Sequence, residues 1–356
     1  MADYLSIVSH FATEGVISGI EPLGAGFIND TLKVFIEGED EPGYILQRKN
    51  HVIFPDVPAM MENIRKVTEH IHSKGAETLT LLKTTEGMLY WRDPDGNFWT
   101  MTTFNKGTRS YERADTPELA FQGGKGLGVF HRQVSDFTEP LEEIIKGFHN
   151  IRWRFTQWDE AIARDAAGRV ASLREEIGWI ESRRKQMLGF WERFEKGEIP
   201  MRVTHNDTKI SNFLFDAGTG ALRCAIDLDT LMSSTLLNDT GDAYRSYTNT
   251  GAEDDPDLGK VGMSFDMFGA YTEGYLSEMK GALERSEIEN LAFSGLYITY
   301  EQVLRFLMDY IDGDTYYKTA YPEHNLIRTR AQHKLLTSME EQLPVMNELV
   351  WRLTSR

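Results

Sequence analysis

The hydrophobic pattern changes along the chain from a period of two residues to a period of three to four. Alternating runs predict strands within residues 17–38, 43–50 and 88–104, where the segment DPDG at 93–96 predicts a turn between two aromatic-rich strands. Residues 57–77 instead place apolar side chains on one helical face and have a glycine near their end. We therefore expect a β-rich first part that is braced by one helix.

The alternation ends after Phe104, and stretches such as 159–197 and 290–314 have apolar positions at helical intervals. A chain of 356 residues also exceeds one ordinary domain, so separate cores are expected. The sequence thus predicts an α+β protein with two lobes. A β-rich N-lobe is expected over 1–105 and a mainly helical C-lobe over 106–356.

Residues suited to chemistry are concentrated in the stretch 203–230. Asp207 and Asn212 lie in or next to a polar loop, and Asp227 and Asp229 follow two further predicted strands that a glycine-containing turn connects. Such a hairpin would bring the loop back beside Asp227. Hard oxygen ligands suit Mg²⁺, and one more carboxylate can accept a proton, so the order of these groups indicates phosphoryl transfer.

In this interpretation Asp207 is the base, Asn212 and Asp227 are ligands of Mg²⁺, and Asp229 is a further candidate ligand. Asp and Asn in loops also serve turns and caps, so the spacing HxDxxxxN is weak evidence until it is joined to ID at the expected distance. His205 is expected to hold the loop through a hydrogen bond rather than to react.

Resemblance to related sequences implies that two acidic residues beyond this stretch, Asp239 and Asp242, support the loop through hydrogen bonds or cap a helix. Neither is placed among the groups that contact substrate. The acidic run at 251–260 is interpreted as a surface loop.

The order HxDxxxxN followed by ID resembles the aminoglycoside phosphotransferase and choline kinase branch of the protein-kinase-like fold. The segments HNDTK, IDLDT, YILQR, MDYIDGD and YPEHNLIRTR resemble the bacterial N-acetylhexosamine 1-kinases over nearly the whole chain. This resemblance implies phosphorylation of N-acetylglucosamine or N-acetylgalactosamine at the anomeric 1-hydroxyl. ATP and Mg²⁺ would be required, and the sugar 1-phosphate and ADP would be formed.

The resemblance also implies a nucleotide site in the N-lobe. The loop with Gly24 and Gly26 would cover the phosphates, where a missing Cβ lets the backbone approach them, although an ordinary hairpin turn has the same composition. Phe104 begins the predicted hinge, where backbone groups are expected to hold adenine.

The strand at 43–50 departs from the kinase pattern. Gln47 or Arg48 stands where protein kinases carry a phosphate-binding lysine, and the similarity of YILQ to the YVLK-like segments of relatives favours Gln47. Gln47 has no charge, so the charge would have to come from Arg48, from Lys49 or from the metal. Neighbouring residues point to opposite faces of a strand, so Gln47 and Arg48 cannot both face the nucleotide. Glu62 and Glu69 on the following helix could pair with a strand cation or simply face solvent.

Arg305 lies four residues from Glu301 and from Asp309 on the predicted helix at 290–314. This spacing suits an exposed ladder of ion pairs. The similarity of RFLMDYIDGDTYY to the hexosamine kinases instead implies that Arg305 and Tyr316 line the sugar pocket. Thr230, directly after the second Asp of IDLDT, is the third substrate-binding candidate.

The chain has 38 Lys and Arg against 55 Asp and Glu, and its formal charge of −17 argues against a nucleic acid partner. Its single cysteine, Cys224, is expected to be a buried apolar filler. The first residues lack a basic start followed by an apolar run, and no stretch of eighteen apolar residues occurs. We expect no membrane span and a cytoplasmic location.

Three alternatives remain open at this point. The acceptor could be choline, homoserine or an aminoglycoside, and the acidity of the chain suits the cationic ones. It could be another free sugar, because Phe27 stands where the hexosamine kinases carry a His. The chain could also be an inactive kinase-like binding module, for which the missing strand lysine is the main argument.

Overall fold

The computed structural model describes residues 4–24 and 28–355. The chain forms two compact units, and neither of them is continuous in sequence. The first unit consists of Met1–Ser110, Gln133–Lys146 and Asn212–Ser233, and the second consists of Tyr111–Arg132, Gly147–Ser211 and Ser234–Arg356. The units therefore differ from the continuous halves 1–105 and 106–356, because two later segments group with the N-terminal residues.

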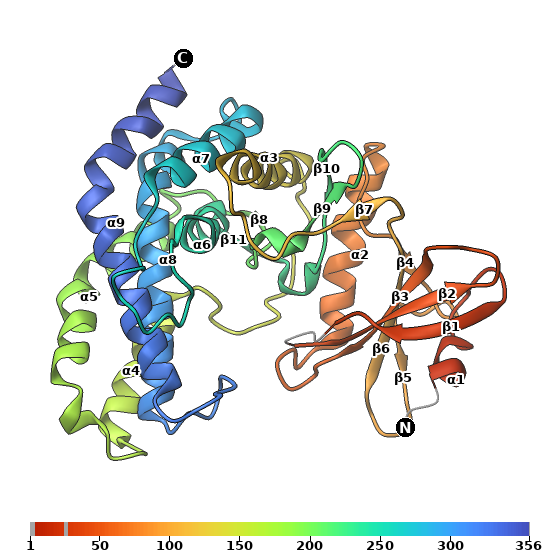
Figure 1. The fold of residues 1–356 in the computed structure, drawn as a ribbon, viewed down its shortest axis with the longest axis horizontal. Coiled ribbons are helices and arrows are strands. Elements are labelled where there is room, and N and C mark those ends of the chain that lie inside the picture. The colour runs from red at the N-terminus through yellow and green to blue at the C-terminus, as the bar shows by residue number, and fades with distance from the viewer. Residues whose placement is uncertain (1–3, 25–27, 356) are drawn as a thin grey trace. The chain divides into compact units, whose positions relative to one another are not determined.

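An antiparallel sheet of six strands forms the body of the first unit (Figure 1). The strand order is β1-β2-β3-β6-β4, and β5 also pairs with β6. The bounds are β1 (Ile17–Pro22), β2 (Asp30–Ile36), β3 (Pro42–Lys49), β4 (Leu81–Leu82), β5 (Trp91–Arg92) and β6 (Phe98–Thr103). The predicted turn joins β5 to β6, and Asp93 N donates to Asn97 O over 2.9 Å.

One face of this sheet is covered by the short helix α1 (Tyr4–Val8) and the residues after it. The core there consists of apolar side chains from α1, β2, β3 and β6, and Leu46 and Val34 are fully buried. Because alternate residues of β3 enter this core, the residues between them face the other side of the sheet.

Helix α2 (Val57–Ser73) confirms the predicted bracing helix. It begins at Asp56, whose carboxylate accepts from Ala59 N over 2.9 Å, and it ends before Gly75, which has a φ of 70°. Its apolar face is buried, as the spacing predicted.

A second, smaller sheet in the first unit has the order β10-β9-β7, with β7 (Thr108–Arg109), β9 (Phe213–Asp216) and β10 (Leu222–Ala225). The predicted hairpin between β9 and β10 is confirmed. Cys224 lies buried in β10 and accepts a hydrogen bond from the Asn105 amide over 3.1 Å. Burial raises the pKa of the Cys224 thiol to about 12, which agrees with an inert filler.

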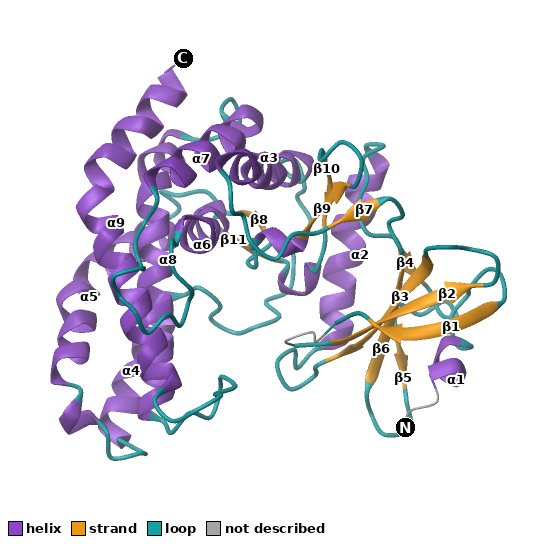
Figure 2. Cartoon of the chain, in the orientation of Figure 1, coloured by secondary structure: helices purple, strands orange, loops and turns teal. Residues whose placement is uncertain are grey.

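Helices dominate the second unit, as predicted (Figure 2). Helix α8 lies at its centre and contacts α4, α5, α6 and α9. The bounds are α3 (Pro117–Gln133), α4 (Ile151–Arg164), α5 (Arg174–Glu195), α6 (Leu236–Thr248), α7 (Phe265–Met279), α8 (Arg285–Ile311) and α9 (His324–Ser355). The stretch 159–197 is not one helix, because the left-handed residues Asp165 and Gly168 separate α4 from α5.

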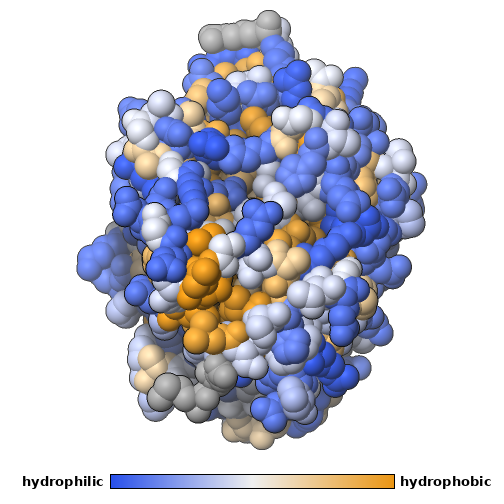
Figure 3. Space-filling model, turned by 90° about the vertical axis from the view of Figure 1, so that its right-hand side faces the viewer, coloured by the Kyte–Doolittle hydropathy of each residue, from blue (hydrophilic) through white to orange (hydrophobic). Residues whose placement is uncertain are grey.

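Short elements connect these helices and sheets. They are the strands β8 (Arg202–Thr204) and β11 (Met232–Ser234) and the 3₁₀ turns η1 (Val170–Ser172), η2 (Ile210–Asn212) and η3 (Leu228–Thr230). Among the described residues, no helix is both long enough and apolar enough to cross a bilayer. Figure 3 shows one face of the molecule, on which hydrophobic residues gather in one region of a mostly hydrophilic surface.

Candidate active site

The predicted metal ligands Asn212 and Asp227 lie at the same end of the β9–β10 hairpin in the first unit. The ladder pairs Phe213 with Ala225, and one residue further out Ile226 N donates to Asn212 O over 2.8 Å. Asp227 has a φ of 57°, a left-handed conformation that turns the chain sharply at the end of the strand. The hairpin therefore brings these two residues together, as the sequence indicated.

Their side chains suit a magnesium ion that arrives with a nucleotide. In the part of the chain that the structure describes, no group of three or more His, Cys, Asp or Glu side chains could hold a metal by itself. Mg²⁺ typically takes one or two protein ligands and completes its shell with phosphate oxygens and water. One amide oxygen from Asn212 and one carboxylate from Asp227 fit that requirement.

Asp229 has a different environment. Lys49 Nζ lies 2.7 Å from its Oδ1 and 2.9 Å from its Oδ2, and the Asn29 amide donates to Oδ2 over 2.7 Å. The side chains of the ion pair are about 4–5% exposed. Asp229 is thus the buried partner of a lysine on β3, and Thr230 after it is also buried.

The residues of β3 alternate as the strand geometry requires. Gln47 and Lys49 share one face, and Lys49 Nζ donates to Gln47 Oε1 over 2.7 Å. Arg48 points to the other face, where it pairs with Asp30 at the surface. Lys49, rather than Arg48, is therefore the cation beside Gln47. The Gln47 amide also donates to Thr31 Oγ1 over 3.2 Å.

Two of the remaining nucleotide-site predictions lie next to strands of the same sheet, Gly24 after β1 and Phe104 after β6. Gly24 has a φ of 66° and open space at its Cβ position, whereas Gly26 and Phe27 lie outside the described residues. Phe104 follows the last residue of β6, and its N–H donates to Gly43 O over 2.9 Å. Its contact with adenine stays a prediction.

Helix α2 does not supply an acid to β3. Glu62 and Glu69 both pair with Arg65 on their own helix, so their interpretation as solvent-facing residues is confirmed. The helix is instead tied down by Asn63, whose amide donates to Leu231 O over 3.0 Å, directly after η3.

Asp207 lies in the second unit, in the loop after β8. Lys209 Nζ lies 3.0 Å from Asp207 Oδ2, and the backbone N–H of Asp207 donates to His205 Nδ1 over 3.3 Å. His205 is buried and holds the loop, as predicted. Asn206 between them has a φ of 65°, which turns the backbone so that consecutive N–H groups point toward helix α6.

Two carboxylates of α6 accept hydrogen bonds from backbone N–H groups of this loop. Asp239 accepts from His205 N and Asn206 N, both over 2.7 Å, and Asp242 accepts from Thr208 N over 3.0 Å. Burial opposes the charge of Asp242, but Arg245 and the hydrogen bonds outweigh it, so its pKa is lowered. The expected support of the loop by both residues is present in the structure.

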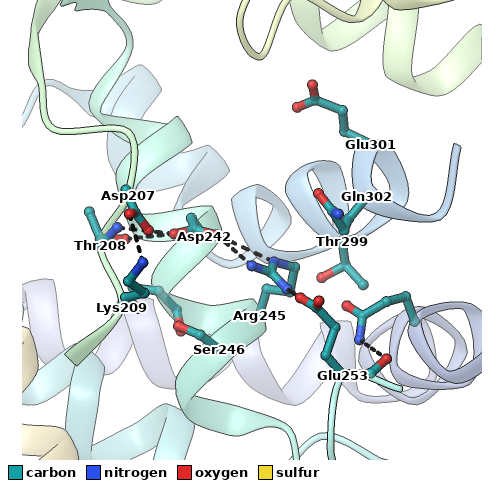
Figure 4. Close-up of polar contacts among 12 residues, drawn as sticks. Asp207, Thr208, Lys209, Asp242, Arg245, Ser246, Glu253, Thr299, Glu301 and Gln302 are labelled. Carbon is teal, nitrogen blue, oxygen red and sulfur yellow. Dashed lines mark hydrogen bonds and ion pairs between the residues drawn. The ribbon is translucent and has the colours of Figure 1, made fainter. Parts of the chain in front are cut away.

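Arg245 connects this loop to the acidic segment after α6. It donates to Asp242 Oδ1 over 3.0 Å and to Glu253 Oε2 over 2.7 Å. Figure 4 shows it between the loop that carries Asp207 and the part of α8 that carries Glu301. The predicted surface loop at 251–260 therefore also contributes a carboxylate to this polar region.

Glu301 and Asp309 do not pair with Arg305, so the interpretation as an exposed ladder of ion pairs is wrong. Glu301 is buried and binds His149 over 2.7 Å and Arg154 over 3.1 Å. Burial alone would raise the pKa of Glu301, but its contacts with His149 and Arg154 lower it to about 2. Four residues beyond Arg305, Asp309 accepts hydrogen bonds from the backbone of the following loop.

Three aromatic rings surround Arg305. Its guanidinium carbon lies 6.0 Å from the ring centroid of Phe148, 5.7 Å from that of Tyr316 and 5.5 Å from that of Tyr317. Tyr316 as a whole is 60% exposed, and its backbone N–H donates to Asp309 Oδ1 over 2.8 Å. The predicted pair of Arg305 and Tyr316 is therefore brought together in the second unit.

Sequence reasoning left out Lys209, Arg245 and Asp309 as site residues. Lys209 could have been found from its position two residues after Asp207, where its ammonium can reach the carboxylate. Arg245 could likewise have been found from Asp242, which lies three residues before it on the same helix. The contacts of Asp309 with residues 315–317 run across a loop, where no periodic pattern reveals them.

Comparison with known proteins shows the fold. The solved structure of a microcompartment-associated aminopropanol kinase has 18% identity, covers 97% of this chain and 98% of that one, and gives a TM-score of 0.66. An amicoumacin kinase in complex with AMP-PNP and Ca²⁺ has 13% identity, covers 94% of this chain and 92% of that one, and gives a TM-score of 0.61. A Plasmodium vivax ethanolamine kinase has 14% identity, covers 88% of this chain and 82% of that one, and gives a TM-score of 0.57. The predicted kinase-like fold is confirmed.

A family model described as the phosphotransferase enzyme family (APH) matches residues 19–267, which is more than half of the chain. The match begins just after the start of β1, ends at the beginning of α7, and includes the loop of Asp207 and the β9–β10 hairpin. The chain therefore belongs to the phosphotransferase enzyme family and is a phosphotransferase that acts on hydroxyl groups.

Proposed function

We propose that this enzyme transfers the γ-phosphoryl group of ATP to the anomeric 1-hydroxyl of an N-acetylhexosamine, N-acetylglucosamine or N-acetylgalactosamine. The products are the sugar 1-phosphate and ADP. The resemblance of five segments to the hexosamine 1-kinases supports this acceptor, and membership of the family supports the reaction type.

Asp207 orients the 1-hydroxyl and accepts its proton. The ring oxygen withdraws electron density from that hydroxyl, so a carboxylate is a sufficient base. Lys209 beside Asp207 supplies a positive charge close to the reacting groups. When it is bound with the nucleotide, Mg²⁺ neutralises charge on the phosphates, and Asn212 and Asp227 are the ligands we propose for it.

The observation that carries the choice of acceptor is the charge balance around Arg305. The acidic side chains near it are paired: Asp242 and Glu253 with Arg245, and Glu301 with His149 and Arg154. Among the described residues Arg305 forms no ion pair, and its polar contact is Gln302 Oε1 at 3.4 Å.

An arginine whose charge is not paired with a carboxylate favours a neutral acceptor over a cationic one. Its remaining N–H donors suit carbonyl and hydroxyl oxygens, and it disfavours an ammonium group next to it. The Tyr316 ring beside it offers an apolar surface for one face of a sugar ring. These properties support an N-acetylated sugar over a cationic amino alcohol.

The second candidate is an amino alcohol or aminoglycoside acceptor. Two of the similar solved structures are kinases of aminopropanol and ethanolamine, and the net charge of −17 suits a cationic substrate. Release of ADP over a panel of free sugars, amino alcohols and aminoglycosides separates the two. Coupling between ³¹P and the anomeric proton in the NMR spectrum of the product locates the phosphate.

Two substitutions test the proposed roles. Asp207→Asn should leave the binding of sugar and nucleotide nearly intact and lower turnover by about a thousandfold or more, and near-normal turnover would remove Asp207 from the mechanism. Arg305→Ala should raise the sugar KM much more than the ATP KM. Arg285→Ala at the exposed start of α8 is the matched control, and equal effects of the two Arg substitutions would refute the role of Arg305.

A further inference from the structure

The start of helix α4 and the middle of helix α8 meet at a buried carboxylate within the second unit. Glu301 of α8 is 1% exposed, and each of its two oxygens has its own partner. His149 Nδ1 lies 2.7 Å from Oε2, and Arg154 Nε donates to Oε1 over 3.1 Å. About one turn earlier on α8, the hydroxyl of Tyr297 donates to His149 O over 2.9 Å. The two helices are therefore joined through the residues that hold Glu301.

His149 has two features that are unfavourable for stability. Its φ of 54° is left-handed, which is uncommon for a residue other than glycine. Its Nε2 is buried and has no hydrogen-bond partner among the described residues, which destabilises the folded state. Features of this kind are retained mainly where they serve function. The position of His149 against Glu301 is thus maintained at a cost in stability.

Arg305 is the partner that helix geometry alone would give to Glu301, because it lies four residues later on the same face of α8. Glu301 instead pairs with His149 and Arg154. The positive charge of Arg154 weakens the attraction between Glu301 and Arg305 and repels the second guanidinium. The ring of Phe148, the neighbour of His149 in the chain, lies 6.0 Å from the guanidinium carbon of Arg305 and offers it a different contact.

We propose that Arg154 is a positioning residue which, with His149 on the other oxygen, holds Glu301 away from Arg305 and so keeps the charge of Arg305 available to the acceptor. This inference rests on the proposed role of Arg305 in binding the acceptor. Without Arg154, one oxygen of Glu301 would be open to Arg305. An Arg305 paired in this way would have fewer donors for the oxygens of an N-acetylated sugar, and it would no longer disfavour an ammonium group.

Arg154→Met tests this competition for Glu301. It should raise the KM for N-acetylglucosamine by about tenfold or more, while the ATP KM stays within about twofold of wild type. The ratio of kcat/KM for N-acetylglucosamine to that for glucosamine, which carries an ammonium group, should fall. Arg152→Met is the matched control, because Arg152 lies on the same helix and pairs with Glu195 at the surface. It should leave all of these values unchanged.

The double variant Arg154→Met/Glu301→Gln separates positioning from stability. A glutamine amide cannot form an ion pair with Arg305, so the double variant should return the sugar KM to within about threefold of wild type. A purely structural role of Arg154 predicts no such return, because the second substitution also alters the contact with His149. Glu301→Gln alone keeps Arg154 and should leave the sugar KM within about threefold of wild type.

Either of two results would overturn the proposal. If Arg154→Met leaves the sugar KM unchanged, or raises it and the double variant does not restore it, Arg154 does not act through Glu301. If Glu301→Gln alone raises the sugar KM as much as Arg305→Ala does, Glu301 supports Arg305 and does not compete for it. Failure of the proposed function is distinguishable, because Arg305→Ala would then leave the sugar KM unchanged.

Discussion

The contact between helices α3 and α7 predicts a large penalty for a single methyl group. Gly124 of α3 faces the backbone of α7, and a Cβ added there would lie 2.0 Å from Tyr271 O. The contact is reciprocal, because a Cβ at Gly274 of α7 would lie 2.0 Å from Phe121 O of α3. The two helices thus touch backbone to backbone through facing glycines.

Gly124→Ala cannot be absorbed by a rotamer change, since the opposing atom belongs to the main chain. Ordinary contact begins at 3.4 Å, so the helices would have to separate by 3.4 − 2.0 = 1.4 Å. Overpacking of this kind costs about 3 kcal/mol or more when the backbone must move. We expect the thermal midpoint to fall by about 6–12 °C.

Differential scanning calorimetry measures this change, and Gly178→Ala on helix α5 is the matched control. At Gly178 no heavy atom lies within 4 Å of an added Cβ, so this substitution should stabilise the helix by about 0.5–1 kcal/mol. If the two variants had equal midpoints, the close contact of α3 with α7 would be refuted. A lower turnover of Gly124→Ala is also expected, because His131 on α3 binds the carboxylate of Asp239 over 2.8 Å.

Three further outcomes can be measured. Asp309→Ala should raise the acceptor KM several-fold with little change in the ATP KM, because the loop that carries Tyr316 loses its hydrogen-bond acceptor; a proportional rise of both would contradict this role. Burial and the nearby Arg183 lower the pKa of His333 to about 4, so only the unfolded state binds a proton between about pH 6.5 and 4, and stability should fall as the pH decreases through that range. Urea unfolding at pH 7.5 and pH 5 should show about 1–2 kcal/mol less of this loss in His333→Gln than in wild type, a value that allows for solvent at the partly exposed ring. The Cys224 thiol should react with a thiol reagent only after unfolding, and rapid labelling of the native protein would refute its burial.

Local patterns predicted the elements of this fold well where each residue's environment depends on near neighbours. The apolar face of α2, the turn between β5 and β6, and the β9–β10 hairpin all follow from short-range periodicity and turn residues. The place of Asn212 next to Asp227 follows from the hairpin register. Stretch 159–197 was predicted less well, because the periodicity continues across the left-handed break at Asp165.

Partners that are distant in sequence could not be predicted in this way. Lys49 was one of two candidate cations on β3, and its buried pairing with Asp229, 180 residues away, could not be predicted from the strand. The spacing of Arg305 from Glu301 suggested an ion pair. The Glu301 carboxylate instead contacts His149, which lies 152 residues from Glu301 in the chain. A helical spacing of four residues defines which side chains are close enough to pair, and the fold decides which of them do.

Both acceptor-side loops are held by carboxylates on helices that contact each other. Asp239 of α6 binds the loop of Asp207, and Asp309 of α8 binds the loop of Tyr316, in each case through consecutive backbone N–H groups. Charged acceptors form strong hydrogen bonds to N–H donors, so the position of each loop follows that of its helix. A Cβ at Gly241 of α6 would lie 2.4 Å from a main-chain oxygen of α8, which fixes the approach of the two helices. The separation of the proposed base from the proposed sugar-binding tyrosine is therefore set by a helix contact and not by either loop.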